Sequence, residues 1–447
     1  MKLEVSKKFI DELSQVANEP EWLVEHRQKS LQIFKKMPIE KNNIFQKYVE
    51  DEEKFDFKKI DKDFKMILKD ETQDDFDMDN SIITTSDGIK NNFKPHERGH
   101  VFTDIFSATN SMIQAKDIFL NTKIDDKMEA FNNAFLNSGV FIYVPIKTEV
   151  TIPLRSIFIL NRDNTPMFNR TIIFVDEGSS LNFVQETYSN NSKSSLYSEH
   201  LEVFVKENSK ANLTFIQNTD NESENMINRK IFSKGICSTF SVNLGGRYTR
   251  YNIESFLNHD GAEANNNDIF FGSGEQKLDM FSRLVHMAPN TRGRVTSKAI
   301  LRDKSQAIFK GMIKILKEAK NTQAYLSDHS IMMSKDAKSN SVPSLEIETD
   351  SVRATHSAST QQLDSDQIFY LTSRGLTEEE AKKTIAFGFF EPFFKQISSK
   401  SMRKCVESMM EDKWENTPGT LKISDMSDVI PKSVEEENIF KDHYKYR

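Results

Sequence analysis

Short apolar runs separated by polar turns dominate the middle of the chain. Runs rich in Val, Ile and Phe follow one another over residues 139–364, and no helical pattern interrupts them. Runs of this length and composition predict β-strands, and the absence of intervening helices disfavours an α/β sheet with crossover helices. The clearest of these predicted strands are residues 140–144, 157–160, 171–175, 201–205, 213–216 and 269–271.

One turn recurs at a fixed spacing within this strand region. The segment 177–183, EGSSLNF, is echoed thirty residues later by segment 207–213, ENSKANL. Similar strand–turn–strand units at a constant period are typical of stacked coils, which favours a β-helix. Many short strands are equally typical of a β-sandwich or a propeller, so the pattern alone leaves these architectures open.

The segments on either side of the strand region read differently. Residues 1–138 are expected to form an N-terminal helical domain that includes a linker of mixed charge over residues 46–95. Beyond residue 364 the pattern is helical again. Thr377 and Glu380 form a capping box, and an apolar stripe at a spacing of four residues follows it. Pro392 is expected to kink or end that helix, and the stripe consists of Ala381, Ile385 and Phe389.

Composition excludes several classes of function. The net charge is −7, with 60 basic and 67 acidic residues, and no strongly basic run marks a nucleic-acid binder. No apolar window is long enough for a membrane span, and the first ten residues lack the apolar core of a signal peptide. Two distant cysteines, Cys237 and Cys405, cannot form a disulfide framework. We therefore expect a cytoplasmic protein with reduced thiols.

Candidate chemistry is sparse along the sequence. There is no P-loop, no GxSxG and no HExxH, and the alternating acidic residues of segment 345–350, LEIETD, are typical of the solvent side of a strand. Three histidines, His286, His329 and His356, lie in the second half of the strand region. Imidazole is a good ligand for iron or zinc, but this spacing does not itself define a metal site.

Several stretches resemble one protein family in order along the chain. They are EPEWLVEHRQKSLQIF (residues 19–34), GVFIYVP (139–145), HMAPNTRGRVTSKAILRDKSQAIFKGMIKI (286–315), NSVPSLEIETDSVRATHSAS (340–359) and LDSDQIFYLTSRGLTEEEAKKTIAFGF (363–389). With these stretches the chain resembles the SufB/SufD family of iron–sulfur cluster assembly scaffold proteins, and it is most similar to SufD.

The resemblance implies a mainly β fold, a right-handed parallel β-helix flanked by N-terminal and C-terminal helical domains. On this basis we expect a β-helix core over residues 139–364 and a C-terminal helical domain and tail over residues 365–447. The family implies a non-catalytic scaffold that pairs with a SufB-like partner and binds a SufC-like ATPase. The expected assembly is a hetero-oligomer, or a homodimer in isolation, with no nucleic-acid or membrane partner.

Two positions separate SufD-like from SufB-like chains. SufB-like chains carry a cysteine after the TQ pair that matches Thr322 and Gln323, whereas this chain has Ala324. SufB-like chains read EHEA where this chain reads THSA, which places His356 at the position of the SufD histidine. The resemblance implies that His356 is a candidate ligand for iron or a nascent cluster at the SufB–SufD interface, bound transiently, with no permanent cofactor.

The resemblance also implies a SufC-docking surface on the C-terminal helices. It consists of Phe369, Tyr370, Arg374, Ile385, Phe389, Phe390 and Phe393. Cys405 matches no family cysteine and receives no role. Two other interpretations stay open: a SufB-like or homodimeric cluster scaffold, and a stand-alone β-helix enzyme.

Overall fold

We describe the protein from a computed structural model. The described residues are 7–38, 64, 66–68, 79–94, 99–162, 165–189, 195–395, 397 and 400–415. Most of the expected charged linker and the tail beyond residue 415 lie outside these ranges.

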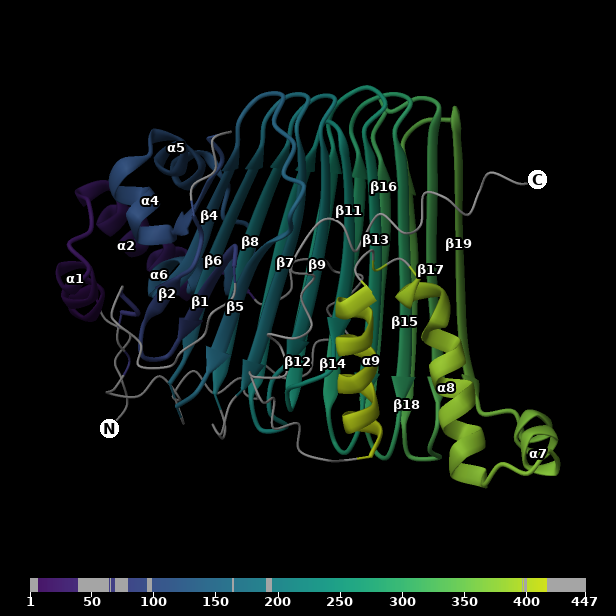
Figure 1. The fold of residues 1–447 in the computed structure, drawn as a ribbon. Helices are drawn as coiled ribbons and strands as arrows, with labels where there is room; N and C mark the ends of the chain where they lie inside the picture. The colour runs from purple at the N-terminus through teal and green to yellow at the C-terminus, as the bar shows by residue number, and fades with distance from the viewer. Residues whose placement is uncertain are drawn as a thin grey trace.

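The strand region forms a parallel β-solenoid of two facing sheets (Figure 1). Strands alternate between the sheets, so that each coil contributes one strand to each, and about eight coils stack from β4 to β19. Sheet A contains β2 (Ile89–Asn91), β1 (Ser81–Thr85), β5 (Leu154–Leu160), β7 (Ser180–Ser189), β9 (Lys210–Asn218), β11 (Ile236–Asn243), β13 (Glu263–Gly272), β15 (Arg292–Leu301), β17 (Thr322–Met332) and β19 (Val352–Gln362). Sheet B contains β3 (Val101–Asp104), β4 (Ser138–Val144), β6 (Met167–Val175), β8 (Leu196–Val205), β10 (Glu224–Ser233), β12 (Tyr248–Leu257), β14 (Lys277–His286), β16 (Gln306–Ile315) and β18 (Lys338–Ile347).

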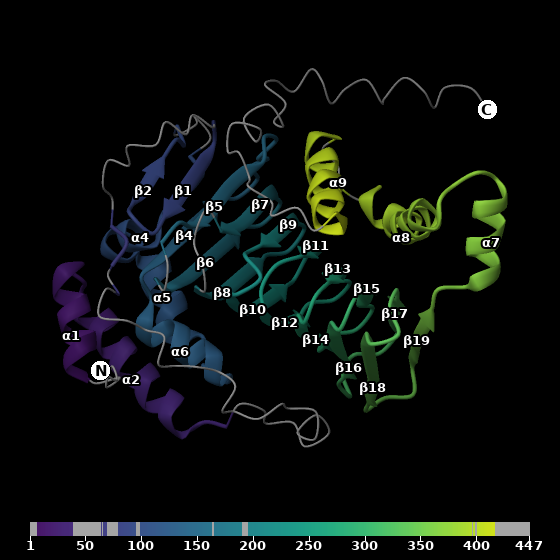
Figure 2. The same ribbon diagram turned by 90° about the horizontal axis from the view of Figure 1, so that it is seen from below.

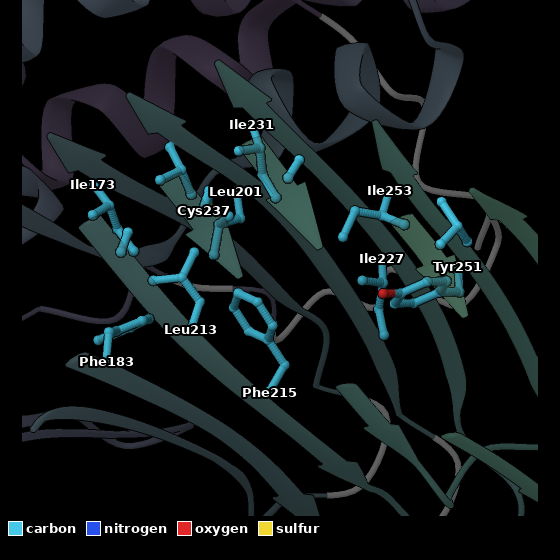
Figure 3. Packing of buried hydrophobic residues seen from close by; sticks show 14 of the residues in the cluster. Ile173, Phe183, Leu201, Leu213, Phe215, Ile227, Ile231, Cys237, Tyr251 and Ile253 are labelled. Carbon is cyan, nitrogen blue, oxygen red and sulfur yellow. The ribbon is translucent and has the colours of Figure 1, made fainter. Parts of the chain in front are cut away.

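The echoed turns stack on each other, as the sequence spacing predicts. Phe183 on β7 lies in register with Leu213 on β9, and the hydroxyl of Ser209 donates to the carbonyl of Asp176 one coil earlier. Side chains at alternate positions fill the interior between the two sheets. Figure 3 shows part of this apolar core, to which sheet A contributes Phe183, Leu213, Phe215 and Cys237, and sheet B contributes Ile173, Leu201, Ile227, Ile231, Tyr251 and Ile253.

The strands begin before residue 139, the expected start of the β-helix core. β1 pairs in parallel with β5, and β2 pairs antiparallel with β1. β3 pairs antiparallel with β4. The β-branched run Ile82–Ile83–Thr84–Thr85 was the sequence signal for β1, and the surrounding charged segment concealed it.

A group of helices covers the N-terminal end of sheet B. It comprises α1 (Lys7–Val16), α2 (Glu21–Lys36), α4 (Ile105–Ser111), α5 (Ile113–Asn121) and α6 (Lys127–Phe135) (Figure 2). Their apolar core continues into the outer face of the sheet through Phe141 and Phe168. Buried Arg27 ties the group together, because it binds Glu19 and also donates to the carbonyl of Ala134. The predicted N-terminal helices are therefore present, and they cap one end of the solenoid.

Within the described residues, three helices follow β19: α7 (Ser365–Ser373), α8 (Glu378–Phe394) and α9 (Lys400–Trp414). The predicted capping box of Thr377 and Glu380 is confirmed at the start of α8. Pro392 does not end that helix, which continues for two residues beyond it. α8 and α9 lie on the outer face of sheet A, whereas α7 projects away from the solenoid (Figures 1 and 2).

Candidate functional site at the open end of the solenoid

Among the described residues, the two sheets end without a cap at β18 and β19. No residue of either strand is buried, whereas the preceding strands β16 and β17 are mostly buried. Each terminal strand is hydrogen-bonded to a neighbour on one side only. An open edge of this kind exposes backbone N–H and C=O groups that can pair with a strand of another chain. Among the described residues, the open end is therefore the part of the solenoid best suited to join a partner.

His356 lies on the inward face of this open end. Ala354 on the same strand packs against the interior core, and alternation places His356 on the same face of β19. Its register neighbour on β17 is Leu326, which is fully buried. His356 is itself exposed, because no further coil of the described part of the chain covers it. The imidazole therefore stands at the mouth of the solenoid interior.

The two other candidate histidines lie elsewhere. His329 occupies the opposite face of β17, and its Nδ1 lies 2.7 Å from the hydroxyl of Ser359 on β19. His286 is buried at the end of β14, where its Nδ1 lies 2.9 Å from the hydroxyl of Thr291, and burial lowers its pKa to about 4. The three histidines do not converge, and no group of three or more metal-ligating side chains forms among the described residues.

The open end carries no thiol of its own among the described residues. Ala324, the position at which SufB-like chains have cysteine, is buried on the inward face of β17 in register with Ala354. Cys237 lies deep in the interior, where burial raises the pKa of its thiol to about 12. Cys405 lies on α9, and its burial together with the Glu186 carboxylate raises the pKa of its thiol to about 12. Both thiols are therefore protonated and unreactive at neutral pH.

A buried carboxyl group lies one coil inside the open end, and sequence reasoning missed it. Asp328 on β17 is 1% exposed and faces Ser297 and Ser341. Burial raises the pKa of Asp328 to about 6. A polar residue that recurs at one inward-facing position of successive coils could have indicated Asp328. That position can be recognised only after the coil register is known.

The residues expected to dock SufC divide into an exposed and a buried set. Phe369 and Tyr370 on the projecting helix α7 are 74% and 56% exposed, and Arg374 stacks over the Tyr370 ring at 5.0 Å. Ile385 and Phe389 on α8 are partly exposed. Phe390 and Phe393 are buried against sheet A.

Fold and site together define the class of protein: a parallel β-solenoid with one capped end, one open end and a projecting helix. No described helix is long and apolar enough to cross a membrane. The family described as "SUF system FeS cluster assembly, SufBD core domain" matches residues 158–389.

Curated relatives extend the match over most of the chain. Proteins named "Iron-sulfur cluster assembly SufBD family protein" from Staphylococcus saprophyticus, Staphylococcus aureus and Staphylococcus epidermidis are each 28% identical to it over 416 residues, which is 88% of this chain and 90% of the relative. The chain belongs to the SufBD family of the SUF iron–sulfur cluster assembly system, because the family match covers more than half of its length.

Proposed function

We propose that this protein is a SufD-like scaffold subunit that pairs with a SufB-like partner and docks a SufC-like ATPase. The observation that carries the proposal is the open end, where β19 presents an inward-facing His356 and the neighbouring strand β17 has Ala324 in place of a thiol. A subunit built in this way supplies an imidazole and requires its partner to supply the thiolate. The role is non-catalytic and cytoplasmic, without nucleic acid or membrane.

Pairing would use the uncapped strands β18 and β19. Strand addition at an exposed edge satisfies backbone hydrogen bonds, and the inward side chains of the last coil would be covered at the same time. Leu345 on β18 and Val352 on β19 are only partly buried although both pack against the interior core. Their burial would add apolar stabilisation to the backbone pairing. The expected product is a hetero-oligomer, with a homodimer when no SufB-like chain is present.

The cargo of the interface would be iron or a nascent cluster. Neutral imidazole is a suitable ligand for iron, and a single histidine from this chain would leave the cluster easy to release. Nothing in this role requires a permanently bound cofactor.

Docking of the SufC-like ATPase would use the exposed side chains of α7 and α8. Phe369 and Tyr370 project together from α7, and buried aromatic anchors carry much of the affinity of protein interfaces. Phe390 and Phe393 would act indirectly, because they hold α8 against sheet A.

Co-purification with both partners tests the assignment. The Phe369→Ala, Tyr370→Ala double variant should lose the SufC-like protein and retain the SufB-like one. Ile113→Ala is the matched control, because Ile113 is 70% exposed on α5 at the other end of the molecule. Hydrogen exchange of β19 should slow when the SufB-like chain is added. Absence of both complexes from the wild-type chain would exclude the proposal.

A further inference from the structure

A column of polar side chains runs along the interior face of sheet A. On the strands of sheet A from β7 to β17, the same register position carries a polar residue on every strand except β9, where it is Phe215. The column ends at Ala358 on β19. The polar members are buried in an interior that is otherwise largely apolar. They are Gln185, Ser241, Asp268, Ser297 and Asp328.

The N-terminal part of this column is satisfied by hydrogen bonds. Gln185 donates to Glu199 at 2.7 Å, and Arg229 donates to Glu199 at 2.6 Å. The Arg229 guanidinium covers the ring of Phe215 at 3.8 Å and bridges the apolar position. This series of hydrogen bonds ends at Asp268, where the Tyr251 hydroxyl donates to Oδ1 at 2.6 Å.

The C-terminal part is satisfied less completely, although the Ser297 and Ser341 hydroxyls face the Asp328 carboxyl group and the Ser241 hydroxyl faces that of Asp268. Five buried oxygen atoms have no hydrogen-bond partner among the described residues. They come from the two facing sheets, one each from β13, β14, β15, β17 and β18. A buried polar atom that stays unpaired destabilises the fold, and ordered internal water commonly satisfies groups of this kind. The atoms are Asp268 Oδ2, Ser282 Oγ, Ser297 Oγ, Asp328 Oδ1 and Ser341 Oγ.

The unsatisfied part leads to the open end. Ser341 lies on the terminal strand β18. Nearby, the hydroxyl of Ser330 lies 2.8 Å from that of Ser339 and 3.0 Å from that of exposed Thr360 on β19. His356 shares the inward face of β19 and lies two residues from Ala358, the register neighbour of Asp328.

We propose that a chain of internal water molecules links Asp268, Ser297 and Asp328 to the open end, and that protons move along it between the two carboxyl groups and the site at His356. The groups that face Asp268 are Tyr251, Ser241 and Arg229. Those that face Asp328 are Ser297, Ser341 and Ala358, with His356 the nearest titratable group on β19.

Both carboxyl groups can exchange protons near neutral pH, because burial raises the pKa of each to about 6. The use of the path at the open end rests on the proposed function. When hydrosulfide becomes cluster sulfide it loses one proton, HS⁻ giving S²⁻ bound to iron. An ionised Asp328 carboxylate would take up that proton through the water chain and become a neutral carboxylic acid, with no change in oxidation state.

The path itself can be tested on the isolated chain, without iron, sulfide or partner. Infrared bands of the protonated carboxyl groups are assigned by their loss in Asp268→Asn and Asp328→Asn. The rate at which each band responds to a jump into ²H₂O is then compared between Ser297→Val and Ser297→Thr. These variants have nearly the same shape, but only threonine keeps the hydroxyl.

The proposal expects the Asp268 band of Ser297→Val to respond at least tenfold more slowly than that of Ser297→Thr, while the Asp328 band is unchanged. Equal rates in the two variants would overturn it. If neither variant folds, the rate of the Asp268 band is compared between Asp328→Leu and Asp328→Asn instead. The leucine variant should respond more slowly, because only asparagine keeps polar groups at this position. A wild-type cluster yield of Asp328→Asn with an active SufB-like partner would overturn the use of the path at the open end, whereas the infrared result would stand by itself.

Discussion

The Nε atom of Arg229 on β10 donates a 2.6 Å hydrogen bond to Oε1 of Glu199 on the neighbouring strand β8. Both side chains are almost fully buried in the interior of the solenoid. The guanidinium also lies 3.8 Å from the centre of the Phe215 ring. Removal of two charges from water is costly, and the pair tolerates burial because its hydrogen bonds and the aromatic face replace hydration.

Glu199→Ala should lower the free energy of unfolding by about 3–5 kcal/mol, because it leaves the Arg229 charge buried without its hydrogen-bonded carboxylate. Urea unfolding followed by circular dichroism measures the change. The control is Glu275→Ala, which removes an exposed ion pair with Lys304 and should leave stability unchanged within error. Equal losses in the two variants would contradict a specific role of the buried pair.

Gly245→Ala should destabilise the solenoid, because a Cβ atom there would lie 2.1 Å from the carbonyl oxygen of Thr219. Backbone cannot move aside as a flexible side chain can, so we expect a fall of several degrees in melting temperature. Gly388→Ala on α8 is the matched control. No atom lies within 4 Å of its added Cβ, and helix propensity should raise stability by about 0.5–1 kcal/mol. A melting temperature of Gly245→Ala at or above that of wild type would refute the close approach.

Docking of α9 should strengthen as the pH rises above 7. The Lys413 amine donates to Gln276 at 2.6 Å and also to the carbonyl of Leu244, and burial beside Arg302 lowers its pKa to about 7. Between that value and the ordinary value of 10.5, only the undocked helix holds the proton. The stabilisation of the docked helix is therefore complete above the ordinary pKa of 10.5 and decreases as the pH falls from there towards 7. Below pH 7 the stabilisation no longer changes with pH.

Fluorescence of Trp414 in a Trp22→Phe background reports this docking, since the chain has two tryptophans. The docking equilibrium should change by at most about tenfold per pH unit between pH 7 and 9. Lys413→Met should abolish the dependence, and Lys383→Met, a more exposed lysine, should retain it. An unchanged slope in Lys413→Met would assign the dependence to another group.

His356→Ala should reduce cluster yield in anaerobic reconstitution with SufB-like and SufC-like partners, by about tenfold or more if the imidazole ligates iron. The assembly itself should remain intact in size-exclusion chromatography. His329→Ala is the matched control, because His329 lies on the opposite face of the neighbouring strand and contacts Ser359. Equal yields from the two variants would remove His356 from iron binding.

The sequence located the strand region and, through the echoed turns at residues 177–183 and 207–213, its thirty-residue period, but the pattern alone left a β-helix open against a sandwich or a propeller. It also located the capping box at Thr377, a local interaction. It was insufficient where an assignment depends on long-range register. Asp328 reads as an isolated acid until β15, β17 and β18 are aligned. The continuation of α8 past Pro392 likewise depends on burial of Phe393 and Phe394 against sheet A.

The two ends of the solenoid differ in a way that limits assembly. At the first end, sheet A closes with the three-residue antiparallel strand β2 and sheet B with the four-residue antiparallel strand β3, and helices cover the outer face there. A solenoid with two open ends would add copies head to tail and grow into fibres. Under the proposed pairing through β18 and β19, each molecule would accept one end-on neighbour there, so strand pairing would stop at two solenoids.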